Sequence, residues 1–152
     1  MPKNLRTIGQ DDLRRDPYAV WNAFTDLLAM SDYADLSETQ RPAHLVFWYE
    51  SEVQNGGHLQ FFLNRGTEQG PETVAALKAL GAPIQASVLE RALAQWASKP
   101  RRASSDLDDV IDEALEDEFE ALDGAFFEAP DELTTVLERH LAQNERDFIL
   151  RA

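Results

Sequence analysis

The sequence predicts an all-α fold: an irregular bundle of six to seven helices in a single domain spanning residues 1–152. Three observations support this class. Apolar residues recur every three or four positions along most of the chain. Prolines, glycines and short polar clusters separate these segments at positions where helices start and stop. No stretch of useful length alternates between polar and apolar residues, so we expect no strands.

The N-terminal part divides into a tail and a first helix. Residues 1–15 precede the first clear helical pattern and are expected to be flexible. Asp16 followed by Pro17 is typical of a helix N-cap and first helical position, and apolar residues then recur at helical spacing. We therefore expect the first helix to begin at Pro17.

A possible capping box precedes the longest predicted helix of the first half. Ser37 and Gln40 are spaced so that each side chain can bind the other's backbone amide. Pro42 lacks an amide hydrogen, so we expect a short turn there and the main helix over 42–54. Residues 55–57 are Asn-Gly-Gly and end it. The remaining helices are expected over 58–64, 71–81, 83–99, 105–124 and 130–150, with Gly124 as the stop of the fourth.

The negative charge of the chain is concentrated in one segment. Residues 103–138, called the acidic segment below, contain fourteen Asp and Glu residues and no Lys or Arg. When the helix predicted over 105–124 is drawn at about 100° per residue, an apolar stripe lies on one side. The opposite side gathers the candidate partner-binding residues Asp109, Asp112, Glu113, Glu116, Glu120 and Asp123.

The charge density of this stripe approaches that of DNA. The ten acidic residues from Asp106 to Asp123 would cover roughly 27 Å of helix, about one charge per 2.7 Å. Duplex DNA carries about one charge per 1.7 Å. The alternative to a partner-binding role is that this side of the helix is a solvent-exposed charged face that aids solubility. However, like charges four residues apart, such as Asp109 and Glu113, destabilise a helix by about 0.2 to 0.5 kcal/mol per pair, and no lysine compensates for them.

Glu118 departs from the stripe. It projects to the apolar side of the predicted helix, the side of Leu115 and Leu122. A carboxylate there must reach solvent, pair with a partner or be protonated. The sequence leaves these alternatives open.

Composition limits the cellular compartment and the classes of partner that we expect for this protein. The chain has no cysteine, which fits a reducing compartment, so we expect a cytoplasmic protein. No apolar run is long enough to span a membrane. The net charge of −14 and the pI near 4.5 argue against direct binding to nucleic acid and favour cationic partners.

The sequence lacks the motifs of common active sites. His44, His58 and His140 are scattered, and none belongs to a pattern that places metal ligands on one helix face. There is no nucleophile elbow, phosphate-binding glycine loop or dinucleotide fingerprint. We therefore expect no catalytic residues, no metal and no cofactor, and no enzymatic activity.

One segment of the sequence is more informative about relationship to known proteins than the overall composition is. Residues Tyr49–Asn64 have the sequence YESEVQNGGHLQFFLN, with its most distinctive part at Asn-Gly-Gly-x-x-Gln-Phe-Phe-x-Asn. This segment resembles a bacterial family of DNA-mimic proteins, and the resemblance extends over about residues 40–150. Further segments that carry it lie at 72–77, 80–82, 122–127 and 131–133.

The resemblance implies an all-helical, acidic protein that can form a dimer and that binds a DNA-binding transcription factor by presenting carboxylates in place of phosphates. The motif residues carried over from the family are Asn55, Gly56, Gly57, Gln60, Phe61, Phe62 and Asn64. Chemically these favour a structural role: a left-handed turn, aromatic anchors, and polar groups that satisfy helix ends. His58 departs from the family, because an aromatic residue is expected after the two glycines.

Three functions follow as hypotheses. The first is a DNA mimic whose carboxylate-rich helix binds the basic surface of a DNA-binding protein such as a transcription factor. The second is an immunity-type or other interaction domain that uses an apolar or mixed surface, with acidity serving solubility. The third is an uncharacterised enzyme, which needs a pocket where the Asn-Gly-Gly motif and a carboxylate converge.

Overall fold

The computed structural model describes residues 4–99 and 118–152. Within these ranges seven α-helices, two short 3₁₀ helices and one two-stranded sheet are present, which confirms the all-α class. The α-helices are α1 (Gln10–Arg15), α2 (Ala19–Met30), α3 (Gln40–Arg65), α4 (Gly70–Ala79), α5 (Pro83–Ala97), α7 (Glu120–Glu128) and α8 (Leu133–Asn144). The 3₁₀ helices are η1 (Tyr33–Asp35) and η2 (Glu145–Asp147).

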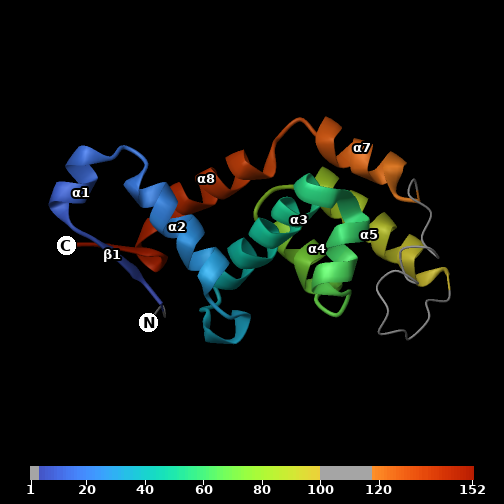
Figure 1. The fold of residues 1–152 in the computed structure, drawn as a ribbon, viewed down its shortest axis with the longest axis horizontal. Helices are drawn as coiled ribbons and strands as arrows, with labels where there is room; N and C mark the ends of the chain where they lie inside the picture. Colours follow the sequence, from blue (N-terminus) through green and yellow to red (C-terminus); the bar gives the residue numbers. More distant parts are fainter. Residues whose placement is uncertain (1–3, 100–117) are drawn as a thin grey trace.

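The expectation of no strands was wrong at the two ends of the chain. β1 (Arg6–Ile8) pairs in parallel with β2 (Ile149–Arg151). Strands of three residues are too short to show a period-two pattern, and their pairing partner lies at the far end of the sequence. β1 and α1 also lie within residues 1–15, which were expected to be flexible. Both termini lie at one end of the elongated molecule (Figure 1).

At the start of α3 the capping box that the spacing allowed is present, but the short turn expected before Pro42 was wrong. The Ser37 backbone N–H donates to Gln40 Oε1 at 3.0 Å, and the Gln40 N–H donates to Ser37 Oγ at 3.3 Å, which confirms the capping box. The helix begins at Gln40 rather than at Pro42. Pro42 therefore lies in the first turn, where a missing amide hydrogen costs nothing within the helix.

Two predicted helices in the C-terminal half have other bounds. The last one, expected over 130–150, ends at Asn144, because the chain then turns through η2 to form β2. Gly124, predicted as a helix stop, lies inside α7 instead. It does not have the positive φ of a terminating glycine, and helix continues so that Phe126, two residues later, is buried. The predicted helix start at residue 105 lies outside the described residues.

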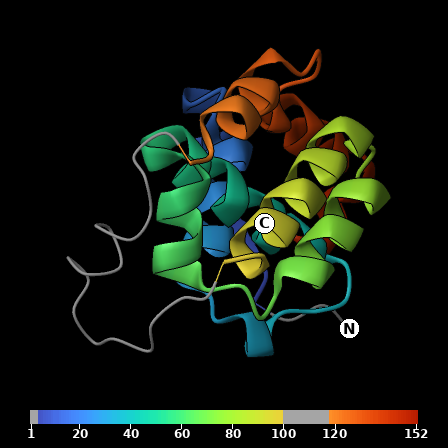
Figure 2. The same cartoon turned by 90° about the vertical axis from the view of Figure 1, so that its right-hand side faces the viewer.

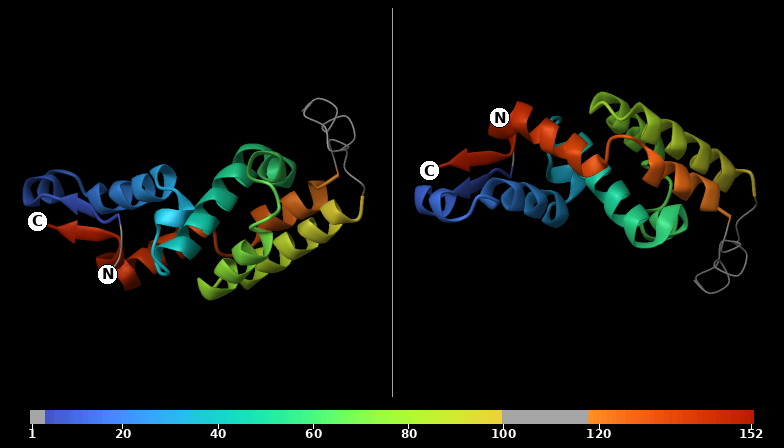
Figure 3. Two further views of the ribbon diagram at one scale, coloured as in Figure 1. Left: turned by 90° about the horizontal axis from the view of Figure 1, so that it is seen from below. Right: turned by 90° about the horizontal axis from the view of Figure 1, so that it is seen from above.

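α3 is the central element and carries much of the core. It packs against α2, α4, α7 and α8, and Tyr49 on this helix is completely buried. Seen along the long axis, α4 and α5 lie on one side of the C-terminal half of α3, with α7 above (Figure 2). The views from below and above place α4, α5 and α7 at the end opposite the termini (Figure 3). Among the described helices, none is both long and apolar enough to cross a membrane.

Candidate partner-binding segment and the Asn-Gly-Gly motif

The structure covers only the end of the predicted carboxylate stripe. Asp109, Asp112, Glu113 and Glu116 lie outside the described residues. Glu120 is exposed in the first turn of α7, where its negative charge suits the positive end of the helix dipole. Asp123 lies one turn further, and 28% of its side chain is exposed. These last two members of the stripe have different surroundings.

Asp123 binds the residue that follows the two glycines of the motif. Its Oδ1 accepts a hydrogen bond from the backbone N–H of His58 at 2.9 Å and lies 2.5 Å from His58 Nδ1. The His58 side chain is completely buried. The carboxylate therefore joins α7 to α3 at the point where α3 is kinked, and it is not a freely exposed charge.

The hydrogen bonds of His58 continue to Tyr49. Tyr49 Oη lies 2.7 Å from His58 Nε2. A neutral ring with its proton on Nδ1 satisfies both contacts, because Nδ1–H donates to Asp123 while Nε2 accepts from the tyrosine hydroxyl. Burial lowers the pKa of His58, although Asp123 opposes this effect, and burial followed by the charge of Asp123 raises the pKa of Tyr49. The neutral histidine and the protonated tyrosine are thus both favoured at pH 7.

Aromatic rings enclose this network. The His58 ring lies 6.2 Å from Phe126, 6.3 Å from Phe62 and 6.4 Å from Phe119, measured between centroids. His58, which stands in place of the aromatic residue expected after the two glycines, thus packs among aromatic rings and adds two polar contacts there. A tyrosine, histidine and aspartate in series resemble an activated nucleophile. However, Tyr49 is completely buried, so its hydroxyl cannot meet a substrate in this arrangement.

The two glycines of the motif form the kink, as predicted. α3 leaves helical geometry at Gly56 (φ −158°, ψ 22°) and Gly57 (φ 73°, ψ −174°). The Gly57 backbone is in a region that is essentially restricted to glycine. A Cβ at Gly57 would lie 3.0 Å from Asp123 Cγ, and a Cβ at Gly56 would lie 2.8 Å from Gln60 Cβ. Both positions therefore require glycine for space, and Gly57 also requires it for its φ.

The remaining polar residues of the motif bind a carboxylate of α3. Gln60 Nε2 and Asn64 Nδ2 donate to Glu52 Oε2 at 3.0 Å and 2.7 Å. The sequence predicted helix-end backbone groups as their partners, whereas the structure gives them Glu52. Arg65 Nε also lies 3.8 Å from Glu52 Oε1. Glu52 is largely buried, so these contacts hold together the two segments of α3 on either side of the kink.

The other members of the motif have simple surroundings. Phe61 and Phe62 are 5% and 2% exposed, as expected of anchors in the core. Asn55 is exposed on the outer side of the kink. The structure therefore places six of the seven carried-over residues in the kink itself, in the contacts that hold it or in the core, and these uses account for their presence.

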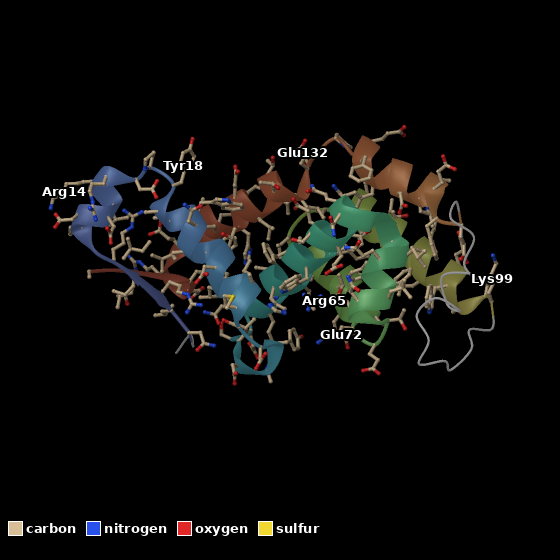
Figure 4. The ribbon with its side chains drawn as sticks, in the orientation of Figure 1. Arg14, Tyr18, Arg65, Glu72, Lys99 and Glu132 are labelled. Atoms are coloured by element: carbon tan, nitrogen blue, oxygen red, sulfur yellow. The ribbon has the colours of Figure 1, made fainter. Side chains whose placement is uncertain are left out.

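Glu118, which the sequence left open, has a cationic neighbour. Its Oε1 lies 3.5 Å from Lys99 Nζ, and its side chain is 2% exposed. Lys99 follows the C-terminal end of α5 (Figure 4). Of the three alternatives, pairing with a partner is the one that the structure shows.

Four hollows on the described surface lie away from the motif's glycines. None of these four is lined by residues 55–60. Two adjacent hollows share His44, Trp48, Arg65 and Gln69, and the Arg65 guanidinium stacks 3.5 Å from the centroid of the Trp48 ring. Within residues 4–99 and 118–152, no group of three or more His, Asp or Glu side chains is placed to hold a metal ion.

Sequence reasoning missed the pairing of Asp123 with His58. Helix periodicity placed Asp123 on the outer, acidic side of a helix expected to end at Gly124. The available signal was that Asp123 and His58 both lie in the segments that carry the family resemblance, 122–127 and Tyr49–Asn64.

Comparison with known proteins agrees with that resemblance. The model of one protein family, described as DMP19-like protein, matches residues 34–144. This range includes the whole of α3, the acidic segment and all of α8. No curated protein and no solved structure matches the chain.

Proposed function

The chain belongs to the DMP19-like protein family, and from this premise we propose that it is a DNA mimic that binds the DNA-binding face of a basic protein such as a transcription factor. The observation that carries the proposal is the acidic segment, with fourteen carboxylates and no Lys or Arg in residues 103–138. Such a surface attracts the cations that a DNA-binding protein uses to contact phosphates.

The described part of the acidic segment supports this proposal. Asp123 and Glu118 have partners on α3 and after α5, so they fix the C-terminal end of the carboxylate stripe to the core. Glu120 is exposed between them. The surface proposed for the partner therefore consists of Glu120 and the stripe residues that precede it, with Asp123 as a positioning residue.

Recognition in this account depends on charge, and it needs neither a cofactor nor a catalytic group. Carboxylates steer a cationic partner at long range, and their contribution weakens as salt screens it. The same field repels nucleic acid, so the partner is a protein rather than DNA. A dimer, as the resemblance implies, would present two such stripes to a two-fold symmetric DNA-binding protein.

The test is an affinity pull-down from nuclease-treated lysate of the source organism. Wild type is compared with a neutralised variant carrying Asn or Gln in place of Asp109, Asp112, Glu113, Glu116 and Glu120. We expect wild type to retain a DNA-binding protein that elutes at moderate salt, and the neutralised variant to retain none. Circular dichroism of the variant checks that its fold is intact.

A matched control removes the same amount of charge elsewhere. Asp11, Asp35, Glu38, Glu68 and Glu72 are all exposed and lie outside the acidic segment. Their replacement by Asn or Gln should leave capture almost unchanged. If instead both five-residue variants retain the same protein through a high-salt wash, an apolar or mixed surface binds it and the DNA-mimic proposal is wrong.

A further inference from the structure

Two consecutive phenylalanines on α7 have opposite surroundings. Phe126 is 7% exposed and packs edge-on against Tyr49 at 5.4 Å. Phe127 is 58% exposed. Its ring contacts that of Phe126 at 5.3 Å, which supports one edge and leaves the rest open to solvent. The core therefore accounts for Phe126 but not for Phe127.

The surroundings of Phe127 are acidic. Glu120 and Glu128 on α7 are exposed, as are Asp131 and Glu132 before α8. Glu120 lies two turns before Phe127 on the same side of the helix, roughly 10 Å along its axis. Between them, Gly124 leaves the helix surface bare, because a Cβ there would meet nothing within 4 Å. The exposed ring thus shares one side of α7 with Gly124 and the carboxylate of Glu120, and exposed acidic residues follow it in the sequence.

A partner for this surface must be both cationic and apolar. Residues 103–138 contain no Lys or Arg, so any protein that covers Phe127 also faces carboxylates without a neutralising neighbour in the sequence. DNA-binding faces have this composition. Lys and Arg contact the phosphates, and small apolar groups between them contact thymine methyl groups and base edges.

We propose that Phe127 is an apolar anchor that inserts between the cations of the partner's DNA-binding face, where the bases of DNA would lie. This rests on the proposed function and adds a second recognition element to it. The carboxylates supply steering and salt dependence, whereas burial of the ring contributes affinity that salt does not screen. Central aromatic side chains of this kind dominate many protein interfaces.

The inference is tested with a photo-crosslinking amino acid, p-benzoylphenylalanine, placed at position 127 of the full chain. The same residue at Tyr18 is the matched control. Tyr18 is 67% exposed and lies at the end of the molecule opposite α7 (Figure 4). Glu132, one of the acidic residues that follow Phe127 in the sequence, lies between α7 and α8 in the same view. After irradiation in nuclease-treated lysate, crosslinked proteins and the attached peptides are identified by mass spectrometry.

We expect position 127, but not position 18, to crosslink to a DNA-binding protein within its DNA-contacting element, and duplex DNA added after removal of the nuclease to suppress the product. No crosslink at 127, a crosslink to a second copy of this chain, or attachment outside the DNA-contacting element would overturn the anchor. If wild type still captures a DNA-binding protein through its carboxylates, the proposed function survives that failure. If wild type also captures no DNA-binding protein, both the anchor and the proposed function are wrong.

Affinity measurements with the identified partner separate the two recognition elements. Because its side chain is mostly exposed, Phe127→Ala should fold normally. We expect it to weaken binding at least tenfold at every salt concentration, with the slope of log Kd against log salt unchanged. The neutralised variant should reduce that slope. An unchanged affinity for Phe127→Ala, or an effect that vanishes at high salt, would contradict the anchor.

Discussion

Asp123 on α7 accepts hydrogen bonds from both the backbone N–H and the ring of His58, the residue directly after the glycine kink of α3. One carboxylate therefore connects the end of the carboxylate stripe to the Asn-Gly-Gly motif. This relationship gives the motif a physical role, which is to position the segment proposed to bind a partner.

Replacing Asp123 with Ala should destabilise the fold. The change removes the acceptor for two donors of His58, one of which is buried with the ring, and hydrogen bonds to charged groups are worth about 1.5 to 3 kcal/mol. We expect a loss of that size in the free energy of unfolding, measured by urea denaturation. Glu120→Ala, one turn earlier and exposed, should change it by less than about 0.5 kcal/mol. Equal effects would show that the contact contributes nothing to stability.

Alanine at Gly57 should cost more than alanine at Gly66. Both glycines have similar backbone geometry, with φ of 73° and 70°, so both substitutions introduce strain of about 1 to 3 kcal/mol. Only at Gly57 does the added Cβ meet the Asp123 carboxylate; at Gly66 it meets nothing within 4 Å. We expect Gly57→Ala to be the less stable variant by at least about 1 kcal/mol in urea. The reverse order would mean that the kink tolerates a side chain.

Lower pH should weaken the fold through the buried histidines. Burial lowers the pKa of His44, His58 and His140 in the folded state from 6.5. The unfolded chain therefore binds protons first, and the stability that these groups contribute is present above pH 6.5 and lost as pH falls through their folded pKa values. Urea denaturation of the Glu50→Gln variant, which lacks the opposing titration of Glu50, should show a declining free energy of unfolding at pH 7.5, 6.5 and 5.5 in turn. A constant or rising value would contradict this.

Glu50 should have the opposite pH dependence. Its Oε1 accepts from Thr134 Oγ1 at 2.5 Å and Gln54 Nε2 at 3.2 Å, while Oε2 is buried without a partner among the described residues. Burial raises its pKa above 4.5. Its favourable contribution is therefore complete below pH 4.5 and is lost as pH rises through the folded pKa.

The Glu50→Gln variant isolates that contribution. The amide cannot ionise, so the unfolding free energy of the variant relative to wild type should shift in favour of Gln between pH 4.5 and 7.5. Urea denaturation across this range measures the shift. Glu68→Gln, an exposed position on the loop before α4, is the matched control and should show none. A difference that moves the other way would mean that the charged form of Glu50 is stabilised in the fold.

Sequence patterns predicted the structural features that depend on residues close together in the sequence. The Ser37–Gln40 capping box and the Gly56–Gly57 kink are set by local geometry, so spacing alone located them. The strands at the two ends were not predictable in this way. Each has three residues, and what makes them strands is a partner about 140 positions away in the sequence.

The candidate site likewise has features that sequence patterns predicted and one that depends on tertiary packing. The location of the acidic segment followed from composition, and Glu120 is exposed as the helix pattern predicted. For Asp123, periodicity gave the side of the helix but not what packs against it. The kink in α3 brings His58 to that side, a tertiary relationship between positions 65 residues apart. From the sequence alone, a carboxylate that packs against the core cannot be distinguished from one that binds a partner.

The most direct test of the central claim is competition between this protein and DNA for the captured partner. A fluorescently labelled duplex containing the partner's binding site is bound to the partner, and fluorescence anisotropy is followed as the protein is added. If the carboxylates replace phosphates, wild type displaces the duplex completely and the neutralised variant does not. A complex that retains both DNA and this protein, or equal displacement by the two forms, would contradict the account.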